Sequence, residues 1–169
     1  MEYFCIMVVT GKEADFKRLA EEQLALLDEK AKLYFFMRKM RTSHGKNYTE
    51  PLFPGYVFLG VEYFTPKIAE SLKTVQYFIH FLNSNQDIVA LSERDREYVE
   101  HFISFGELQG VSKATFDEND RIVVVEGPLK GFAGKIIRVN RRRCRATVRL
   151  DMFNNSITFD LMYDLISSE

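Results

Sequence analysis

The sequence predicts an α+β protein in which a ferredoxin-like α/β sandwich is followed by a small β-barrel. Two observations lead to this fold class. The first part of the chain alternates between strand and helix patterns in the order β-α-β-β-α-β, and a further helix follows. Periodicity then fades, and the last ~50 residues carry only short, closely spaced strands, a pattern typical of a small barrel. The predicted division is an N-terminal domain at 1–105, a linker at 106–118 and a barrel at 119–169.

The first domain is predicted to begin with a buried strand over the apolar run Tyr3–Val9. Thr10 and Glu13 fit a capping box, in which both side chains bond to free backbone amides at the start of a helix that extends to about Glu29. The same patterns predict the other elements, which are strands at 33–40, 56–61 and 77–81, a helix at 66–73 capped by Thr65, and a helix opened by Ser92.

The second domain is predicted to be all-β. The expected strands are 121–125, 134–139, 144–150, 156–159 and a terminal stretch near Leu165. The glycines between them are interpreted as hairpin glycines, where a positive φ is needed, rather than as a phosphate-binding loop. No lysine-serine pair opens a following helix, as a phosphate-binding loop would require.

Composition excludes several classes of protein. The net charge of −1 means that any contact with nucleic acid must come from local patches. The two cysteines, Cys5 and Cys144, lie in separate strand-like runs, so a disulfide framework or a cysteine-based zinc site is implausible. The N-terminus does not resemble a signal peptide, and no apolar run approaches 18 residues. We therefore expect a soluble cytoplasmic monomer without membrane contact.

The sequence lacks the residue groups that catalysis requires. His44, His80 and His101 lie far apart, and none has a carboxylate or cysteine partner at metal-ligand spacing. Hydrolase, metalloprotease and nucleotide-binding motifs are also absent from the sequence. The prediction is a binding protein with no catalytic residues, no metal and no cofactor.

The segment 50–58 is the strongest candidate for a partner site in the first domain. Its prolines fix the entry of a strand on which Tyr56 and Phe58 share one face. Helices cover only one face of such a sheet, so an uncovered aromatic face would form a hydrophobic patch of the kind that binds partners. The alternative is that these aromatic residues all belong to the core. Phe78 and Phe81 are further candidates on a neighbouring strand.

Two segments concentrate positive charge. Residues 37–49 contain four basic residues and no acid, and their tip at 43–47 is predicted to be an exposed hairpin. Residues 118–150 contain nine basic residues and three acids, a local charge of +6. Guanidinium groups on a rigid sheet suit phosphate contacts, although a merely solvated strand face remains the alternative. The candidate nucleic-acid-binding residues are Arg38, Lys39, Arg41, His44, Lys46, Arg138, Arg141, Arg142, Arg143, Arg145 and Arg149.

Segments throughout the chain resemble the NusG family of transcription elongation factors. Residues 3–11 resemble the family's opening strand, residues 50–58 its signature in RfaH-like specialised paralogues, and residues 75–81 the strand that follows. Residues 120–136 match a KOW motif, and residues 150–153 fit the rest of that barrel. The resemblance implies a NusG N-terminal (NGN) domain followed by a KOW β-barrel.

This resemblance implies a transcription elongation and antitermination factor that binds RNA polymerase. In the family, an aromatic groove docks on the clamp helices of the largest polymerase subunit, and relatives approach upstream DNA where the hairpin around His44 lies. The barrel loops match positions where relatives bind Rho or a ribosomal protein. The implied polymerase-binding residues are Met7, Phe53, Tyr56, Phe58, Phe78 and Phe81. The implied KOW partner-binding residues are Leu129, Lys130, Phe132, Met152 and Phe153.

The arginine-rich barrel resembles the LoaP branch of the family, whose members act on long operons and recognise an RNA hairpin. RfaH-like paralogues read non-template DNA instead, and the strand pattern of 121–159 argues against an RfaH-like switch of the barrel into helices. The leading hypothesis is an operon-selective antiterminator whose basic barrel contacts nascent RNA. The alternatives are a general NusG-type factor that couples polymerase to Rho or the ribosome, and a ribosome-associated KOW protein.

Overall fold

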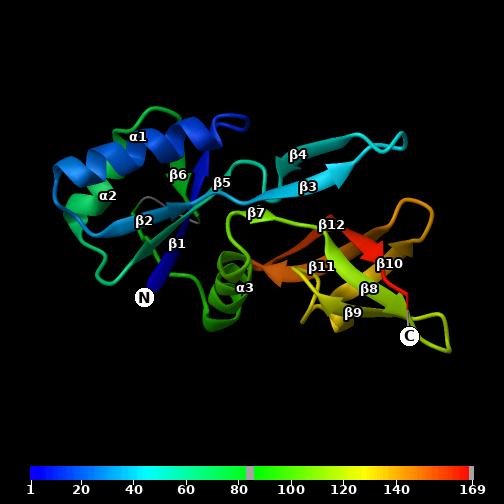
Figure 1. Cartoon of the computed structure of the whole chain (residues 1–169). Helices are drawn as coiled ribbons and strands as arrows, with labels where there is room; N and C mark the ends of the chain where they lie inside the picture. The colour runs from blue at the N-terminus through cyan, green and yellow to red at the C-terminus, as the bar shows by residue number, and fades with distance from the viewer. Residues whose placement is uncertain (83–85, 168–169) are drawn as a thin grey trace. The chain divides into compact units, whose positions relative to one another are not determined.

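The computed structural model describes residues 1–82 and 86–167, and the chain divides into two compact units (Figure 1). Unit 1 comprises Met1–Phe36 and Phe53–Val99, and unit 2 comprises Met37–Leu52 and Glu100–Glu169. The hairpin at 37–52, which the sequence assigns to the first domain, thus belongs to unit 2 by its contacts. The predicted domains also include residues 83–85 and 168–169, which lie outside the described residues. None of the helices in the described part of the chain has the length and hydrophobicity needed to span a bilayer.

Unit 1 is built on a four-stranded antiparallel sheet in the order β2-β5-β1-β6. Its strands are β1 (Glu2–Val8), β2 (Ala31–Tyr34), β5 (Tyr56–Val61) and β6 (Phe78–Phe81). Helices α1 (Glu13–Leu26) and α2 (Pro66–Lys73) lie together on one side of this sheet (Figure 1). Their apolar positions complete the core with alternate strand residues, among them Phe16, Leu24, Ile68, Ile6 and Val57. This arrangement confirms the predicted α/β sandwich.

Two of the three predicted helix starts have the expected caps. The Thr65 hydroxyl accepts a hydrogen bond from the Ile68 amide at 3.2 Å, with Pro66 as the first helical residue. The Ser92 hydroxyl accepts one from the Asp95 amide at 3.2 Å, directly before α3 (Glu93–Ser104). Local sequence was sufficient here because a cap involves only residues within one helical turn.

The predicted capping box at Thr10 is wrong. The N-cap position of α1 is Lys12, and no side chain caps it. The Glu13 carboxylate accepts the Gly11 amide at 3.0 and 3.1 Å, but it also accepts the amide of the distant Gly55 at 2.9 Å. The helix is also shorter than predicted, since Asp28 adopts a φ of 54°, a left-handed conformation that cannot continue a helix.

The single strand predicted at 33–40 is two strands. β2 ends at Tyr34, and β3 (Met37–Arg41) pairs instead with β4 (Asn47–Pro51) and with β7 (Leu108–Gln109) in a separate three-stranded sheet. The run of strand-forming residues continues across the break, so periodicity does not reveal the change of partner. The hairpin tip between β3 and β4 lies where it was predicted.

The barrel of unit 2 is a five-stranded sheet in the order β10-β11-β12-β8-β9. Its strands are β8 (Ser112–Phe116), β9 (Ile122–Glu126), β10 (Ile136–Asn140), β11 (Arg145–Met152) and β12 (Asn155–Leu165), with a short 3₁₀ turn, η1 (Ala133–Lys135), before β10. The two predicted C-terminal strands are one long strand, β12. Residues 106–118, expected to be a linker, carry β7 and β8, and β8 pairs in parallel with β12. This pairing joins segments far apart in sequence, which local patterns do not predict.

Gly127, within the predicted KOW motif, allows its turn to close tightly on β8. It has a φ of 104°, and a Cβ there would lie 2.6 Å from Ser112 Cα and Oγ. The Ser112 hydroxyl in turn accepts the Leu129 amide at 3.0 Å. Any side chain at 127 would therefore separate the turn from the strand.

Candidate functional site

The sheet face of unit 1 opposite α1 and α2 is partly open. Met7 pairs with Tyr56 on one side and with His80 on the other, so these three side chains are neighbours in one row across β5, β1 and β6. All three are half-buried. Burial, and to a lesser degree the Cys5 thiol, raises the pKa of Tyr56, so its phenol keeps its proton to a higher pH than a free tyrosine does. The row therefore combines apolar surface with two polar groups, the Tyr56 hydroxyl and the His80 imidazole.

Phe58 does not lie on an open surface. Its side chain is 0% exposed, and its ring packs against Phe36 and Phe53 with centroid distances of 5.6 and 5.7 Å. Phe53 is also buried. The expectation that Tyr56 and Phe58 together form an uncovered aromatic face is therefore wrong for Phe58. The sequence analysis left open the alternative that these aromatic residues belong to the core, and this alternative is correct for Phe53 and Phe58.

Phe78 and Phe81 lie on the face of the sheet that the helices cover. Phe81 pairs with Ile6 and is buried in the core, while Phe78 is partly buried against the same core, 5.3 Å from Phe81 between ring centroids. The six residues implied for polymerase binding thus do not form one surface, and only Met7 and Tyr56 reach the open face. The sequence argument missed His80, which pairs with Met7 directly before a register shift in the pairing of β1 with β6.

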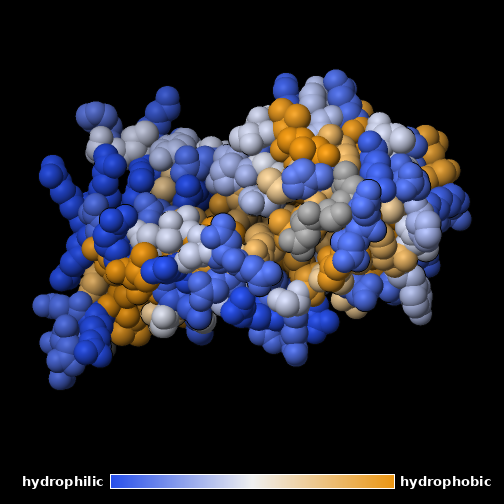
Figure 2. Space-filling view, turned by 180° about the vertical axis from the view of Figure 1, so that it is seen from behind, coloured by the Kyte–Doolittle hydropathy of each residue, from blue (hydrophilic) through white to orange (hydrophobic). Residues whose placement is uncertain are grey.

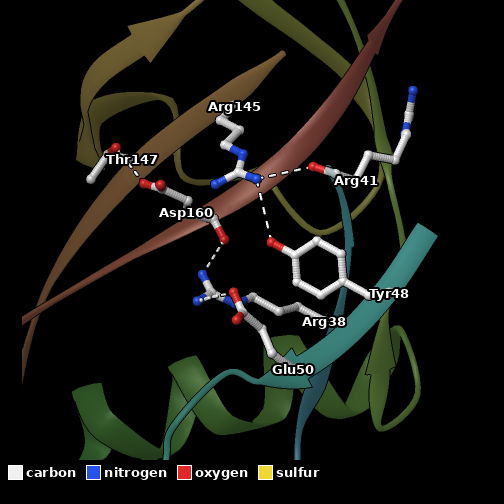
Figure 3. Close-up of polar contacts among 7 residues, drawn as sticks. All are labelled: Arg38, Arg41, Tyr48, Glu50, Arg145, Thr147 and Asp160. Atoms are coloured by element: carbon white, nitrogen blue, oxygen red, sulfur yellow. Dashed lines mark hydrogen bonds and ion pairs between the residues drawn. The ribbon is translucent and has the colours of Figure 1, made fainter. Parts of the chain in front are cut away.

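Three of the predicted nucleic-acid-binding arginines hold the hairpin against β11 and β12 within unit 2 (Figure 3). Arg38 forms an ion pair with Glu50 at 2.8 Å and donates to the carbonyl of Asp160. Arg145 donates to the carbonyl of Arg41 at 3.0 Å and contacts the Tyr48 hydroxyl at 3.4 Å. The Arg41 guanidinium itself pairs with Asp164. We call this set of contacts the hairpin latch.

The other predicted basic residues differ in whether their side chains have a partner within the described part of the chain. Arg141 stacks 3.9 Å from the centre of the Phe116 ring and lies 3.6 Å from Asp120, while Arg149 donates to Ser156 at 2.7 Å. Six side chains form no hydrogen bond or ion pair with the described residues, namely Lys39, His44, Lys46, Arg138, Arg142 and Arg143. Figure 2 shows hydrophilic side chains projecting from the surface of unit 2, with apolar surface between them.

A cavity of about 530 Å³ lies between the hairpin tip and the turn that joins β10 to β11. The hairpin contributes Arg41, Thr42 and Ser43, and the turn contributes Asn140, Arg142 and Arg143. No aspartate or glutamate is among its lining residues. The two basic segments that the sequence predicts separately are therefore brought together at this cavity.

The residues implied for KOW partner binding are mostly buried. Leu129, Phe132 and Met152 are core residues, and the Phe132 ring lies 4.3 Å from the ring of His101, at the end of α3. Lys130 is exposed and Phe153 is half-buried. Three of the five residues implied for partner binding therefore lie in the core, and their role in partner binding stays a prediction.

Candidate metal ligands do not cluster among the residues that the structure describes. The nitrogens of two histidines are engaged locally. His101 Nε2 lies 2.7 Å from the Pro128 carbonyl, and His80 Nδ1 lies 2.7 Å from the Phe81 carbonyl. These rings therefore act as structural and surface groups rather than as a catalytic pair.

An α/β sandwich with an open sheet face, followed by a basic KOW barrel, defines a class of two-part binding proteins of transcription. Residues 1–100 match the NusG family model, which is described as transcription termination factor nusG, and residues 118–149 match the KOW motif. The chain therefore belongs to the NusG family. Proteins of this family are transcription factors and not enzymes, so the predictions of the family and of a non-enzymatic protein are confirmed.

Individual relatives are distant but cover almost the whole chain. The transcription termination/antitermination protein NusG of Thermus thermophilus is 22% identical over 182 residues, covering 98% of this chain and 97% of that protein. The NusG of Synechocystis is 22% identical over 183 residues, covering 99% and 89%. A solved structure on domain interaction in Thermotoga maritima NusG has a TM-score of 0.62 at 20% identity, covering 95% of this chain and 93% of that one, and so shares the fold.

Proposed function

We propose that this chain is a transcription elongation and antitermination factor that binds RNA polymerase through unit 1 and contacts nascent RNA through unit 2. It would promote processive transcription of selected operons in the cytoplasm. The observation that carries the polymerase contact is the row of Met7, Tyr56 and His80 on the open sheet face of a NusG-family domain. The clamp helices of the largest polymerase subunit are the proposed partner of this row.

The RNA contact is supported by the charges that the fold leaves unused. Arg142 and Arg143 extend from the β10–β11 turn, and no described residue neutralises either side chain. Guanidinium groups that are free in this way suit contacts with the phosphates of a nucleic acid. The burial of Leu129, Phe132 and Met152 also favours selective antitermination over coupling to Rho or the ribosome, which is the second candidate function.

The polymerase contact is tested by replacing Tyr56 with aspartate, which puts a charge in the open row. A central aromatic residue of an interface typically contributes about 2 kcal/mol or more, so we expect core polymerase to bind about 30-fold more weakly and readthrough of a terminator to be lost. The Tyr63→Asp variant is the matched control, because Tyr63 lies in the same unit and is 80% exposed.

Equal polymerase binding by wild type and Tyr56→Asp would reject the proposed docking face. Thermal unfolding of both variants separates lost binding from lost folding, since Tyr56 is half-buried. A chain that binds ribosomal subunits but not core polymerase would instead support the third possibility, a ribosome-associated KOW protein.

A further inference from the structure

We infer that the cavity between the hairpin tip and the β10–β11 turn is a single binding site for the phosphodiester backbone of an RNA strand. Hairpin and barrel would then hold the same strand rather than two separate nucleic acids. This inference rests on the RNA contact proposed above and deepens it by naming the site. We call the cavity the phosphate cavity.

The charge of the phosphate cavity suits an anion. Arg142 and Arg143 line it, and both guanidinium groups lack a partner among the described residues. Arg41 also lines it but pairs with Asp164, so its charge is largely compensated. Two guanidinium groups without a partner, in a lining that contains no acid, suit phosphate oxygens, which arginine binds through planar, bidentate contacts.

Both walls of the cavity are held in place before any ligand binds. The hairpin tip is closed by hydrogen bonds between Thr42 and Lys46, backbone to backbone at 2.8 Å and amide to hydroxyl at 3.0 Å. On the opposite wall the Asn140 side chain accepts the Arg143 amide at 3.0 Å. Preformed walls reduce the ordering cost of binding, so weak phosphate contacts can add up to measurable affinity.

The hairpin latch fixes the two walls relative to each other. Arg145, directly after the turn, donates to the carbonyl of Arg41, directly before the hairpin tip (Figure 3). Ser43 completes the site, because its exposed hydroxyl forms no hydrogen bond within the described residues and is free to donate to a phosphate oxygen. A strand that contacts Arg142 and Arg143 would therefore also pass Ser43.

The test measures fluorescence anisotropy of a labelled 20-nucleotide uridine RNA with the full-length chain over a series of KCl concentrations. The double variant Arg142→Gln/Arg143→Gln should weaken binding about tenfold or more. It should also reduce the slope of log K against log salt by about 1.4, since each phosphate contact to a single strand contributes about 0.7. The Lys135→Gln variant, on an exposed lysine of η1 that does not line the cavity, should have an effect of less than about twofold.

A substitution in the hairpin tests whether the hairpin and the barrel both contribute to the phosphate cavity. Ser43→Asp places a carboxylate beside the bound phosphate and should weaken binding about tenfold. Asn155→Asp is its matched control, because it adds the same charge and keeps the acceptor for the Ser156 amide. Asn155 lies about 23 Å along β12 from Met162, which lines the cavity, at 3.3 Å per residue.

The possible results separate this inference from the proposed function. If Ser43→Asp binds RNA as tightly as Asn155→Asp while the arginine variant is weakened, the barrel alone binds RNA and the composite site is wrong. If wild type binds no RNA but still binds core polymerase, the RNA contact fails and the docking proposal stands. Tighter binding of a thymidine DNA 20-mer than of the RNA would assign the phosphate cavity to DNA and overturn its assignment to RNA.

Discussion

Glu13 joins two segments of unit 1 that the sequence analysis treated separately. Glu13 is 2% exposed, and its carboxylate accepts the backbone amides of Gly11, shortly before α1, and of Gly55, directly before β5. A charged acceptor in the first turn of a helix also interacts favourably with the helix dipole. Since Tyr56 follows Gly55 directly, Glu13 helps to fix the strand that carries the proposed polymerase contact.

Replacing Glu13 with alanine should therefore destabilise the protein. The buried Gly55 amide and the partly buried Gly11 contact would lose a charged acceptor, and we expect the free energy of unfolding to fall by about 2–4 kcal/mol, measured by urea denaturation. Glu22→Ala on the same helix is the control, because its ion pair with Arg18 at 3.4 Å is exposed, and a change of less than about 0.5 kcal/mol is expected. Equal effects of the two substitutions would contradict a special role for Glu13.

At the scale of elements, the hairpin of β3 and β4 is the part of the fold with two roles. Its tip lines the phosphate cavity, and its strands are held by the hairpin latch. We expect Arg145→Ala to break the two contacts with Arg41 and Tyr48 and to raise hydrogen exchange across 37–51 about tenfold. Arg149→Ala, four residues along the same strand, should leave this exchange unchanged. No difference between these variants would show that other contacts hold the hairpin.

The elements that the sequence predicted well are those defined by local signals. β5 matches its predicted range of 56–61, α2 begins at the Thr65-Pro66 cap, and the hairpin tip at 42–46 lies within one residue of the predicted 43–47. Each of these depends on residues within a few positions, through strand alternation, capping or turn chemistry. The overall α+β fold could be predicted because the order of such local elements was correct.

The elements that the sequence predicted poorly depend on contacts between distant segments. Strand periodicity does not distinguish Arg145 from Arg149, because both belong to the same face of β11. In the structure, however, Arg145 donates a hydrogen bond to the hairpin, whereas Arg149 donates one to Ser156. Alternation likewise placed Phe58 beside Tyr56 on one face but could not say that Phe36 and Phe53 cover it. Which candidate residues are free is a property of tertiary packing, and it decides both proposed sites.

At the scale of the whole molecule, one thiol and two phenols make the stability of the fold depend on pH in the alkaline range. Burial, with a smaller effect of Asp95, raises the pKa of the Cys5 thiol well above its ordinary value of 9.0. Burial also raises the pKa of Tyr56 and of Tyr163 above 10.0, with smaller effects from neighbouring groups. At high pH the folded chain therefore keeps protons that the unfolded chain has lost, and the unfolded state becomes favoured.

The free energy of unfolding should accordingly be constant between pH 7 and 8 and fall as pH rises above about 9, where the unfolded thiol and phenols begin to ionise. Urea denaturation at a series of pH values measures this decline. Cys5→Ala removes the most strongly shifted group, so its curve should start lower, because a buried side chain is shortened, and should fall less steeply between pH 8.5 and 10. Parallel curves for the variant and wild type would mean that Cys5 does not couple folding to pH. The tyrosines of the open sheet face and the barrel would then be the remaining source of the decline.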